Sequence, residues 1–418
     1  MSLFTHAELA SALCECLDAS LREAPPFDPS PTIDLAVVAF AHHAPPVWAN
    51  ILVTRGHNSP VVAGISPDAS SVRGIRYLVD PTDEQRRSVA WLPGVDWRQL
   101  APLQSLHGSG PVESIAPYPA SLIKVMVAVG VGLLIDRDRA QWSEPWAWGN
   151  RMQTVLQWAH GMITESRNED TSALVALLHA RGLITQSRST VVKARCDGKA
   201  AHTQVNGLHE SFLAYGLHTL RLDRTTVDGG WLNRDGSGVG HLQMTAWDTV
   251  RLLWLMLPEV MPNCPVPPWL APNTPTLLQP HTARVLWQLM DEQALHEVLS
   301  SSVCVGVPGW RAGIPAQIPE RWVRPDGRVA AADRQWPGDT RPLQAQAQVR
   351  FAHKTGTTEN YASDAGWVRS LNPDGRRYLV AMLSTLGSRH APHAGLATDW
   401  CIPALGARID AWLAQRLG

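Results

Sequence analysis

Charged residues are scarce in this 418-residue chain, at 17% against about 25% in an average soluble domain. Acidic and basic residues nearly cancel, with a net charge of -1, and the sequence contains no run of basic residues. Such a chain attracts neither a phosphate backbone nor an anionic membrane surface. We therefore expect no nucleic-acid partner, and the hydrophobic share of 45% excludes a disordered chain.

Cysteine and long apolar runs are scarce as well. The six cysteines, at positions 14, 16, 196, 264, 304 and 401, are too few and too scattered for a disulfide framework. The longest apolar run, Val125 to Ile135, is shorter than the roughly 20 residues of a membrane span. The amino-terminal segment lacks the basic start and apolar stretch of a signal peptide. The sequence thus predicts no membrane association and, if Met1 is the native start, a cytoplasmic location.

Signatures of metal and phosphate sites are missing too. The pairs His42-His43 and His390/His393 have no acidic partner at a recognised spacing, and HExxH does not occur. The glycine-rich stretch from Gly229 to Gly240 lacks the lysine of a phosphate-binding loop. We expect neither a catalytic metal nor a cofactor.

Strand-like segments at the two ends of the chain enclose a helical middle. Ile33 to Ala41 is a nearly unbroken β-prone run, and Ala365–Arg369 and Arg377–Leu383 flank the turn sequence Asn-Pro-Asp-Gly. This order predicts an α+β protein whose antiparallel sheet is completed by the C-terminal strands. The predicted units are an N-terminal helical extension (1–30), a sheet domain (31–120 and 346–418), a mainly helical domain (121–304) and an inserted Pro/Gly/Arg-rich loop (305–345).

Lysine is the rarest basic residue: it occurs only at positions 124, 193, 199 and 354, against 32 arginines. An ammonium group is more compact than a guanidinium and loses its proton more readily, so a retained lysine marks a position where arginine cannot substitute. Lys124 belongs to Ser121-Leu-Ile-Lys124, where the chain enters an apolar helix. Residues three apart share a helix face, and a lysine of lowered pKa there suits a general base for a serine hydroxyl. In isolation SxxK is a weak motif, and a capping serine with a lysine that extends to the surface is the favoured interpretation.

Two further short motifs follow in the chain. Ser166-Arg167-Asn168 lies between two predicted helices, so its hydroxyl and amide can face a substrate, although either side chain could merely cap the next helix. Lys354-Thr355-Gly356 ends a predicted strand, and Gly356 lets the backbone approach a ligand. The plain alternative for this segment is an edge strand that ends in a glycine turn.

Together, SxxK, SxN and KTG in this order resemble the serine β-lactamase and penicillin-binding-protein superfamily. The chain is most similar to the class A β-lactamase branch, through MITESRNEDTSALVALL and FLAYGLHTLRLDR. The resemblance covers about residues 31 to 418 and implies an antiparallel sheet, a helical lobe and an active site in the cleft between them.

The resemblance also implies roles for the motif residues. Ser121 would be the nucleophile, Lys124 its base and Ser166 the proton shuttle to the leaving group. The substrate would be held by the side chains and backbone of the other motif positions: Asn168 for an amide, Lys354 for a carboxylate, and Thr355, Gly356 and Thr357 along the strand. The backbone N–H groups of Ser121 and Thr357 would form the oxyanion hole.

The sequence departs from the family pattern at two places. Arg167 occupies the position where the SDN motif has aspartate. The deacylating glutamate that class A enzymes carry after Leu-Asp-Arg is absent, because Leu222-Asp223-Arg224 is followed by TTVDGGWLN. Asp228 is the only carboxylate in this loop and therefore the candidate deacylation base, while Asn233 matches the motif's asparagine.

Three functions remain open from the sequence. The first is a serine hydrolase that acts on an amide or ester, such as a β-lactam, through a Ser121 acyl-enzyme. The second is a D-alanyl-type peptidase, esterase or acyltransferase with the same nucleophile, and the third is an inactive binding protein. The expected partner is a small-molecule or peptide-like acyl substrate; no oligomeric state is predicted.

Overall fold

The computed structural model describes residues 4–42, 44–57, 59–100, 103–187, 203–261 and 263–418. Expectations that concern His43, Lys193, Cys196 or Lys199 therefore lie outside the described residues. Within the described part of the chain, no helix is both long and apolar enough to cross a bilayer.

A six-stranded sheet forms the centre of the molecule, and every neighbouring pair in it is antiparallel. Its strand order is β17-β18-β19-β1-β2-β3. The strands from the two ends of the chain meet where β1 pairs with β19. Their bounds are β1 (Ile33–Phe40), β2 (Val47–Val53), β3 (Val61–Val62), β17 (Val349–Thr357), β18 (Ala362–Ser370) and β19 (Arg377–Ser384).

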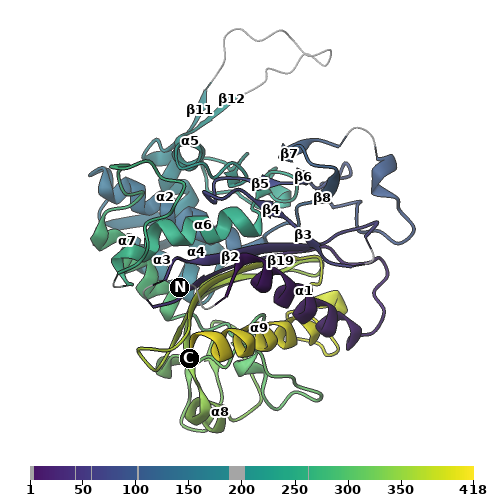
Figure 1. Cartoon of the computed structure of the whole chain (residues 1–418). Coiled ribbons are helices and arrows are strands. Elements are labelled where there is room, and N and C mark those ends of the chain that lie inside the picture. Colours follow the sequence, from purple (N-terminus) through teal and green to yellow (C-terminus); the bar gives the residue numbers. More distant parts are fainter. Residues whose placement is uncertain (1–3, 43, 58, 101–102, 188–202, 262) are drawn as a thin grey trace.

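Two helices from opposite ends of the chain cover one face of this sheet (Figure 1). They are α1 (His6–Arg22) and α9 (Cys401–Leu417). Thr5 and Glu8 form a capping box at the start of α1, which satisfies backbone N–H groups that the helix itself leaves unpaired. Apolar residues of α1, α9 and the sheet share one buried cluster, so the N-terminal helix is part of the layer that closes this face.

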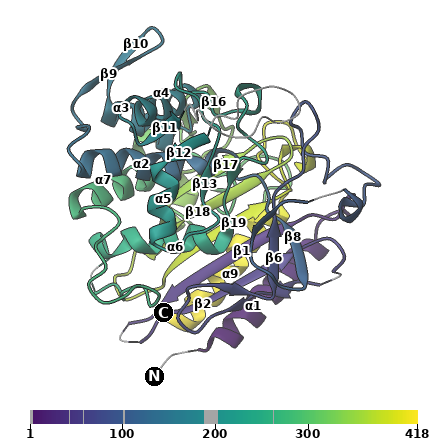
Figure 2. The same ribbon diagram turned by 90° about the horizontal axis from the view of Figure 1, so that it is seen from above.

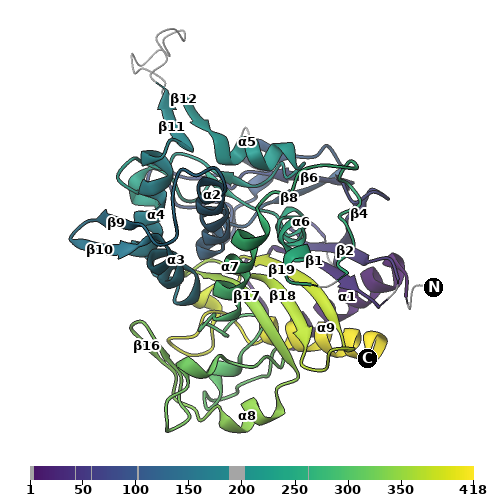
Figure 3. The same ribbon diagram turned by 90° about the vertical axis from the view of Figure 1, so that its left-hand side faces the viewer.

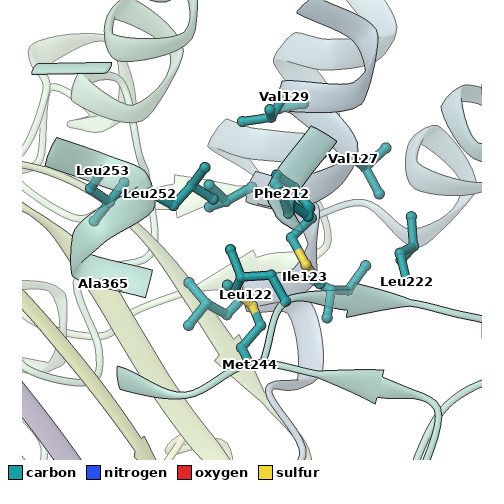
Figure 4. Packing of buried hydrophobic residues seen from close by; sticks show 14 of the residues in the cluster. Leu122, Ile123, Val127, Val129, Phe212, Leu222, Met244, Leu252, Leu253 and Ala365 are labelled. Atoms are coloured by element: carbon teal, nitrogen blue, oxygen red, sulfur yellow. The ribbon is translucent and has the colours of Figure 1, made fainter. Parts of the chain in front are cut away.

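The other face carries the helical lobe (Figures 2 and 3). Helix α6 packs on β1, β18 and β19, and α7 packs on β17. The lobe's helices are α2 (Lys124–Asp136), α3 (Val155–Thr164), α4 (Asn168–Ala180), α5 (Gly207–Ala214), α6 (Ala246–Met256) and α7 (Pro280–Asp291). Leu122 and Ile123 point into the lobe's core close to Met244, which anchors the start of α2 (Figure 4).

Smaller elements surround these layers. β6 (Ile75–Leu78), β7 (Ser105–His107) and β8 (Val112–Ile115) form a three-stranded sheet. The other short strands pair two by two: β4 (Gly64–Ile65) with β5 (Val72–Arg73), β9 (Pro145–Trp148) with β10 (Arg151–Thr154), β11 (Ile184–Ser187) with β12 (Thr203–Asn206), β13 (Arg221–Leu222) with β14 (Leu242–Gln243), and β15 (Ala330–Ala331) with β16 (Arg334–Gln335).

The predicted fold class is confirmed: an α+β architecture in which C-terminal strands complete an antiparallel sheet flanked by helices. The Asn-Pro-Asp-Gly turn joins β18 to β19 as expected. The exact unit boundaries stay a prediction.

Two local expectations need correction. The sequence pattern predicts a helix over Thr282–Leu299. Helix α7 ends at Asp291 instead, because Gln293 turns inward and its amide donates to the carbonyl oxygen of Ile163 at 2.9 Å. That buried contact with α3 outweighs the helical pattern of the sequence. The inserted segment is also more ordered than a loop, since it contains β15, β16 and α8 (Arg341–Gln346).

Candidate active site

Ser121 lies on a tight 3₁₀ turn, Ala120–Ile123, that leads into α2 at Lys124. Ala120 has a φ of 51°, a left-handed conformation that non-glycine residues rarely adopt and that costs roughly 1–3 kcal/mol. The hydroxyl of Ser363, on β18, lies 2.7 Å from the carbonyl oxygen of Pro119 and fixes the turn from the sheet side. The turn is thus held by the sheet and by the lobe's core together.

Gly356 on β17 packs directly against this turn. A Cβ atom there would lie 2.3 Å from the Pro119 carbonyl oxygen and 2.6 Å from the Leu122 nitrogen, closer than real Cβ contacts. Only glycine allows the KTG strand to lie this near to the serine turn. The structure therefore brings the first and third motifs together through backbone contact.

The loop between α3 and α4 delivers the second motif. Ser166 has a φ of 62°, the second left-handed non-glycine residue at the site. Its conformation turns both its carbonyl and its hydroxyl towards Lys124, whose Nζ lies 2.5 Å from the Ser166 carbonyl oxygen and 3.1 Å from Oγ. Asn168, the first residue of α4, accepts a hydrogen bond from the same Nζ at 2.9 Å through Oδ1.

Lys354 approaches the same hydroxyl from the sheet. Its Nζ donates to Ser166 Oγ at 2.9 Å and to the Thr355 carbonyl oxygen at 2.7 Å. The two amino groups thus share one hydroxyl, although they come from α2 and from β17. We call this cluster of Lys124, Lys354 and the Ser166 hydroxyl the lysine junction.

Both lysine side chains are completely buried, and their hydrogen-bond partners among the described residues are neutral. Burial, followed by the neighbouring charge of Lys354, holds the pKa of Lys124 well below its usual value, against the weaker pull of Asp170. Burial also lowers the pKa of Lys354 to about 7, although the charges of Asp364 and Glu297 oppose it. Burial thus favours the uncharged form of both amines.

Lys124 Nζ has three contacts, with the Ser166 carbonyl oxygen, Ser166 Oγ and Asn168 Oδ1. They fit the three N–H donors of an ammonium. They also fit an uncharged amine that donates to the two carbonyl oxygens and turns its lone pair to a hydroxyl, which is the property that a general base needs.

The remaining predicted residues lie around this junction. Ser121 is partly exposed, and among the described residues its hydroxyl forms no hydrogen bond with Lys124. Asn168 is exposed and Thr357 partly so, whereas the Thr355 side chain is buried. These positions leave Ser121, Asn168 and Thr357 accessible to a ligand; their individual roles stay predictions.

Asp228 lies apart from the junction. Its side chain is exposed and accepts a hydrogen bond from the Thr226 hydroxyl, which lowers the pKa of the carboxyl group. Within the described chain, no hydrogen bond or ion pair joins it to Ser121 or Lys124. Its assignment as a deacylation base stays a prediction without a supporting contact.

A tryptophan from the same loop does reach the junction. The ring centre of Trp231 lies 5.5 Å from Lys124 Nζ, and the side chain is 2% exposed. Asn233 does not reach it, because its Oδ1 accepts from the Val239 N–H at 2.7 Å within the loop. Sequence reasoning missed Trp231, since nothing in the spacing of one tryptophan among 18 singles it out.

The inserted segment also borders the junction. Glu165, directly before Ser166, accepts at 2.8 Å both from the Ala332 N–H, at the tip of the β15–β16 hairpin, and from the Arg167 guanidinium. Arg167, which stands where the SDN motif has aspartate, is thus engaged by its own loop. This contact joins the β15–β16 hairpin of the inserted segment to the loop that carries Ser166.

Among the residues that the structure describes, no group of three or more histidine, cysteine, aspartate or glutamate side chains is arranged to hold a metal ion. The buried pair His353 and Asp364, whose Nδ1 and Oδ1 atoms are 2.7 Å apart, lies directly behind Lys354 and was not expected from the sequence.

No protein-family model matches this chain, and no curated protein matches it. Solved structures do resemble it. PBP-A is 14% identical over 96% of this chain and 95% of its own, with a TM-score of 0.44. A β-lactamase from Sphaerobacter thermophilus (11% identity, 97% of each chain, TM-score 0.47) and a class A β-lactamase from Bacteroides cellulosilyticus (14%, 98% of each, 0.46) are similar as well.

Proposed function

We propose that this protein is a serine hydrolase of the β-lactamase-like type that attacks an amide or ester through an acyl-enzyme on Ser121. The observation that carries the proposal is the pair of buried lysines that share the Ser166 hydroxyl. A merely structural lysine pair would cost folding free energy without a charge partner to offset it. A functional role explains why the cost is tolerated: an uncharged amine one helical turn from the accessible Ser121 can act as its base.

In the first step, Lys124 accepts the Ser121 hydroxyl proton while Oγ attacks the substrate carbonyl carbon. Backbone N–H groups of Ser121 and Thr357 stabilise the oxyanion that forms. When the carbon–nitrogen or carbon–oxygen bond breaks, Ser166 passes a proton to the leaving group and recovers one from Lys124, with which it is already in contact. The products are an ester on Ser121 and a protonated leaving group.

Substrate recognition is assigned to Lys354 and Asn168. An ammonium has three donors, and the contacts of Lys354 with Ser166 and Thr355 use two of them. The third suits a substrate carboxylate. Asn168 is exposed, so its amide can also contact an amide of the substrate.

The test is acylation of Ser121 by penicillin G or a fluorophosphonate, followed by intact mass spectrometry. We expect a single covalent adduct on the wild-type protein and none on Ser121→Ala. Ser363→Thr, which keeps a hydroxyl on β18, serves as a control for folding. A wild-type protein that stays unmodified, under conditions that label PBP-A, contradicts the proposal.

A second candidate function is transfer of the acyl group to an amine, in the manner of an acyltransferase or peptidase. The observation that favours it is the loop from Leu222 to Asn233, whose one exposed carboxylate, Asp228, contacts Thr226 and not the junction. An adduct that persists in water but disappears when glycinamide is added, with formation of the acyl-glycinamide, supports transfer. Equal loss with and without the amine supports hydrolysis.

A further inference from the structure

The indole ring of Trp231 closes one side of the lysine junction. Its centre lies 5.5 Å from Lys124 Nζ, while the other contacts of that nitrogen are the Ser166 carbonyl, the Ser166 hydroxyl and Asn168. The amine has no exposed surface. A water molecule that attacked an ester on Ser121 would have to enter this packed arrangement to reach a base.

The loop is built to hold the ring in place. The Asp235 carboxylate accepts from the Trp231 and Leu232 N–H groups at 3.1 and 3.0 Å, and the Thr226 hydroxyl accepts from the Gly230 N–H at 2.8 Å. Gly229, with a φ of 93°, lies so near α4 that a Cβ atom would be 2.2 Å from the Ser172 carbonyl oxygen. The backbone of the loop is therefore fixed on both sides of the tryptophan.

The polar side chains of the same loop are occupied elsewhere. The carboxylate of Asp235 binds backbone N–H groups, and Asn233 binds Val239. The carboxylate of Asp228 is in solvent and bound to Thr226. The loop thus presents an apolar ring to Lys124, while the side chains of Asp228, Asn233 and Asp235 form their hydrogen bonds elsewhere.

We propose that Trp231 is a positioning residue that shields the Lys124 amine from water, and that this shield directs the acyl group on Ser121 to a primary amine instead of to water. The proposal rests on the proposed function, because it needs the acyl-enzyme. Water is a weak nucleophile that depends on a positioned general base, whereas a primary amine attacks an ester without one. Removing water and a second base from the site therefore slows hydrolysis more than aminolysis.

The transfer step balances without a further reagent. The amine nitrogen forms a bond to the acyl carbon, and the bond between that carbon and Ser121 Oγ breaks. Lys124 is uncharged again at this stage, because its proton passed to Ser166 when the leaving group departed. One amine proton therefore moves from the nitrogen to Lys124, and Lys124 passes it on to Oγ. The products are an amide and the free serine.

The experiment compares Trp231→Ala and Trp231→Phe with Trp247→Phe. Trp247 is a matched control, since its indole is also buried, at 1% exposure, and its Nε1 is likewise without a hydrogen-bond partner among the described residues. Each protein is labelled with penicillin G across a pH series. The loss of the adduct is then followed by intact mass, with and without glycinamide.

We expect opposite changes in two readouts for Trp231→Ala. The adduct should be lost to water at least about tenfold faster, and the share passed to glycinamide should fall. At the same time, labelling should need a higher pH, because water at Lys124 favours the charged amine. Trp231→Phe should lie between this variant and the wild type, and Trp247→Phe should match the wild type.

The outcomes separate the two proposals. A wild-type protein that forms no adduct overturns the proposed function, and the shield with it. If the wild type and Trp231→Phe are labelled and share one adduct lifetime and one pH profile, the shield is wrong while the acyl-enzyme stands. General destabilisation would slow labelling in Trp247→Phe as well and would not speed adduct loss, so a change shared by both tryptophans also overturns the proposal.

Discussion

Buried cations lie on both sides of the central sheet, but their surroundings differ. On the side of α1 and α9, Arg376 forms two hydrogen bonds with Asp410, at 2.7 and 2.6 Å, and both residues are nearly inaccessible. On the side of the helical lobe, Lys124 and Lys354 are buried with hydroxyl, amide and carbonyl oxygens as their partners. Arg376 thus has a carboxylate partner, and the hydrogen-bond partners of the two lysines are neutral.

The difference appears in the pKa values. Burial alone pulls the pKa of Arg376 down, but the hydrogen bonds and charge of Asp410 together outweigh it, and the pKa is raised. At the junction nothing outweighs burial, so the pKa of each lysine falls. The buried Arg376 forms a structural ion pair with Asp410, whereas a buried lysine with neutral partners can act as a base near neutral pH.

The largest expected effect comes from replacing one kind of buried cation with the other. Lys124→Arg places a guanidinium that stays charged at neutral pH, so it cannot accept the Ser121 proton. We expect labelling by penicillin G to slow by a factor of about 100 or more, the usual contribution of a general base. Arg376→Lys is the reciprocal change, and its folded fraction should be labelled at the wild-type rate. Normal labelling of Lys124→Arg would show that the amine is not the base.

The Arg376–Asp410 ion pair should affect the stability of the fold and not the acylation of Ser121. Asp410→Asn leaves Arg376 buried without a counter-charge, which costs about 3–5 kcal/mol in typical cases. Urea unfolding measures the loss. Asp228→Asn is the matched change at an exposed aspartate and should alter the free energy of unfolding by less than about 0.5 kcal/mol. Equal losses of unfolding free energy in both variants would contradict a stabilising role for the Arg376–Asp410 ion pair.

The pH dependence of the unfolding free energy tests whether the buried Lys354 loses its charge. Lys354 has a pKa of about 7 in the folded protein and about 10.4 when unfolded. Between these values the unfolded chain holds the extra proton, so this lysine makes stability rise with pH from about 7 to 10. The contribution is lost as pH falls from about 10 to 7, and below 7 it no longer changes. The difference in unfolding free energy between wild type and Lys354→Met should show this slope. A flat difference would mean that Lys354 keeps its charge when buried.

The smallest expected effect concerns the support of the serine turn. Ser363→Ala removes the hydroxyl 2.7 Å from the Pro119 carbonyl oxygen and should lower stability by about 1 kcal/mol. Because the neutral partners of both lysines are untouched, labelling should become slower without a change in its pH midpoint. A shifted midpoint would place Ser363 in the electrostatics of the junction and not only in its support.

Much of this arrangement can be predicted from short patterns. The β-prone runs and the Asn-Pro-Asp-Gly turn lead to the sheet, because strands and tight turns are determined by nearby residues. The scarcity of lysine singled out Lys124 and Lys354, and the structure places both against Ser166. A site whose chemistry arginine cannot perform can therefore be recognised from the few lysines that the chain contains.

Other features have no local signal. Trp231 and Lys124 are 107 positions apart, and only the folded loop brings the ring to the amine. The contact of Glu165 with the backbone of Ala332 leaves no mark on the sequence, since any residue except proline offers an N–H. The end of α7 at Asp291 depends on a partner in α3. Tertiary contacts of this kind override periodicity.

The layer of α1 and α9 has a practical consequence. These two helices lie side by side on the face of the sheet that is turned away from the lysine junction (Figure 1). Fusion to a carrier ahead of α1 or attachment to a sensor surface through α9 would therefore tether the molecule by its back. The serine turn would remain open to ligands in solution, whichever end served as the handle.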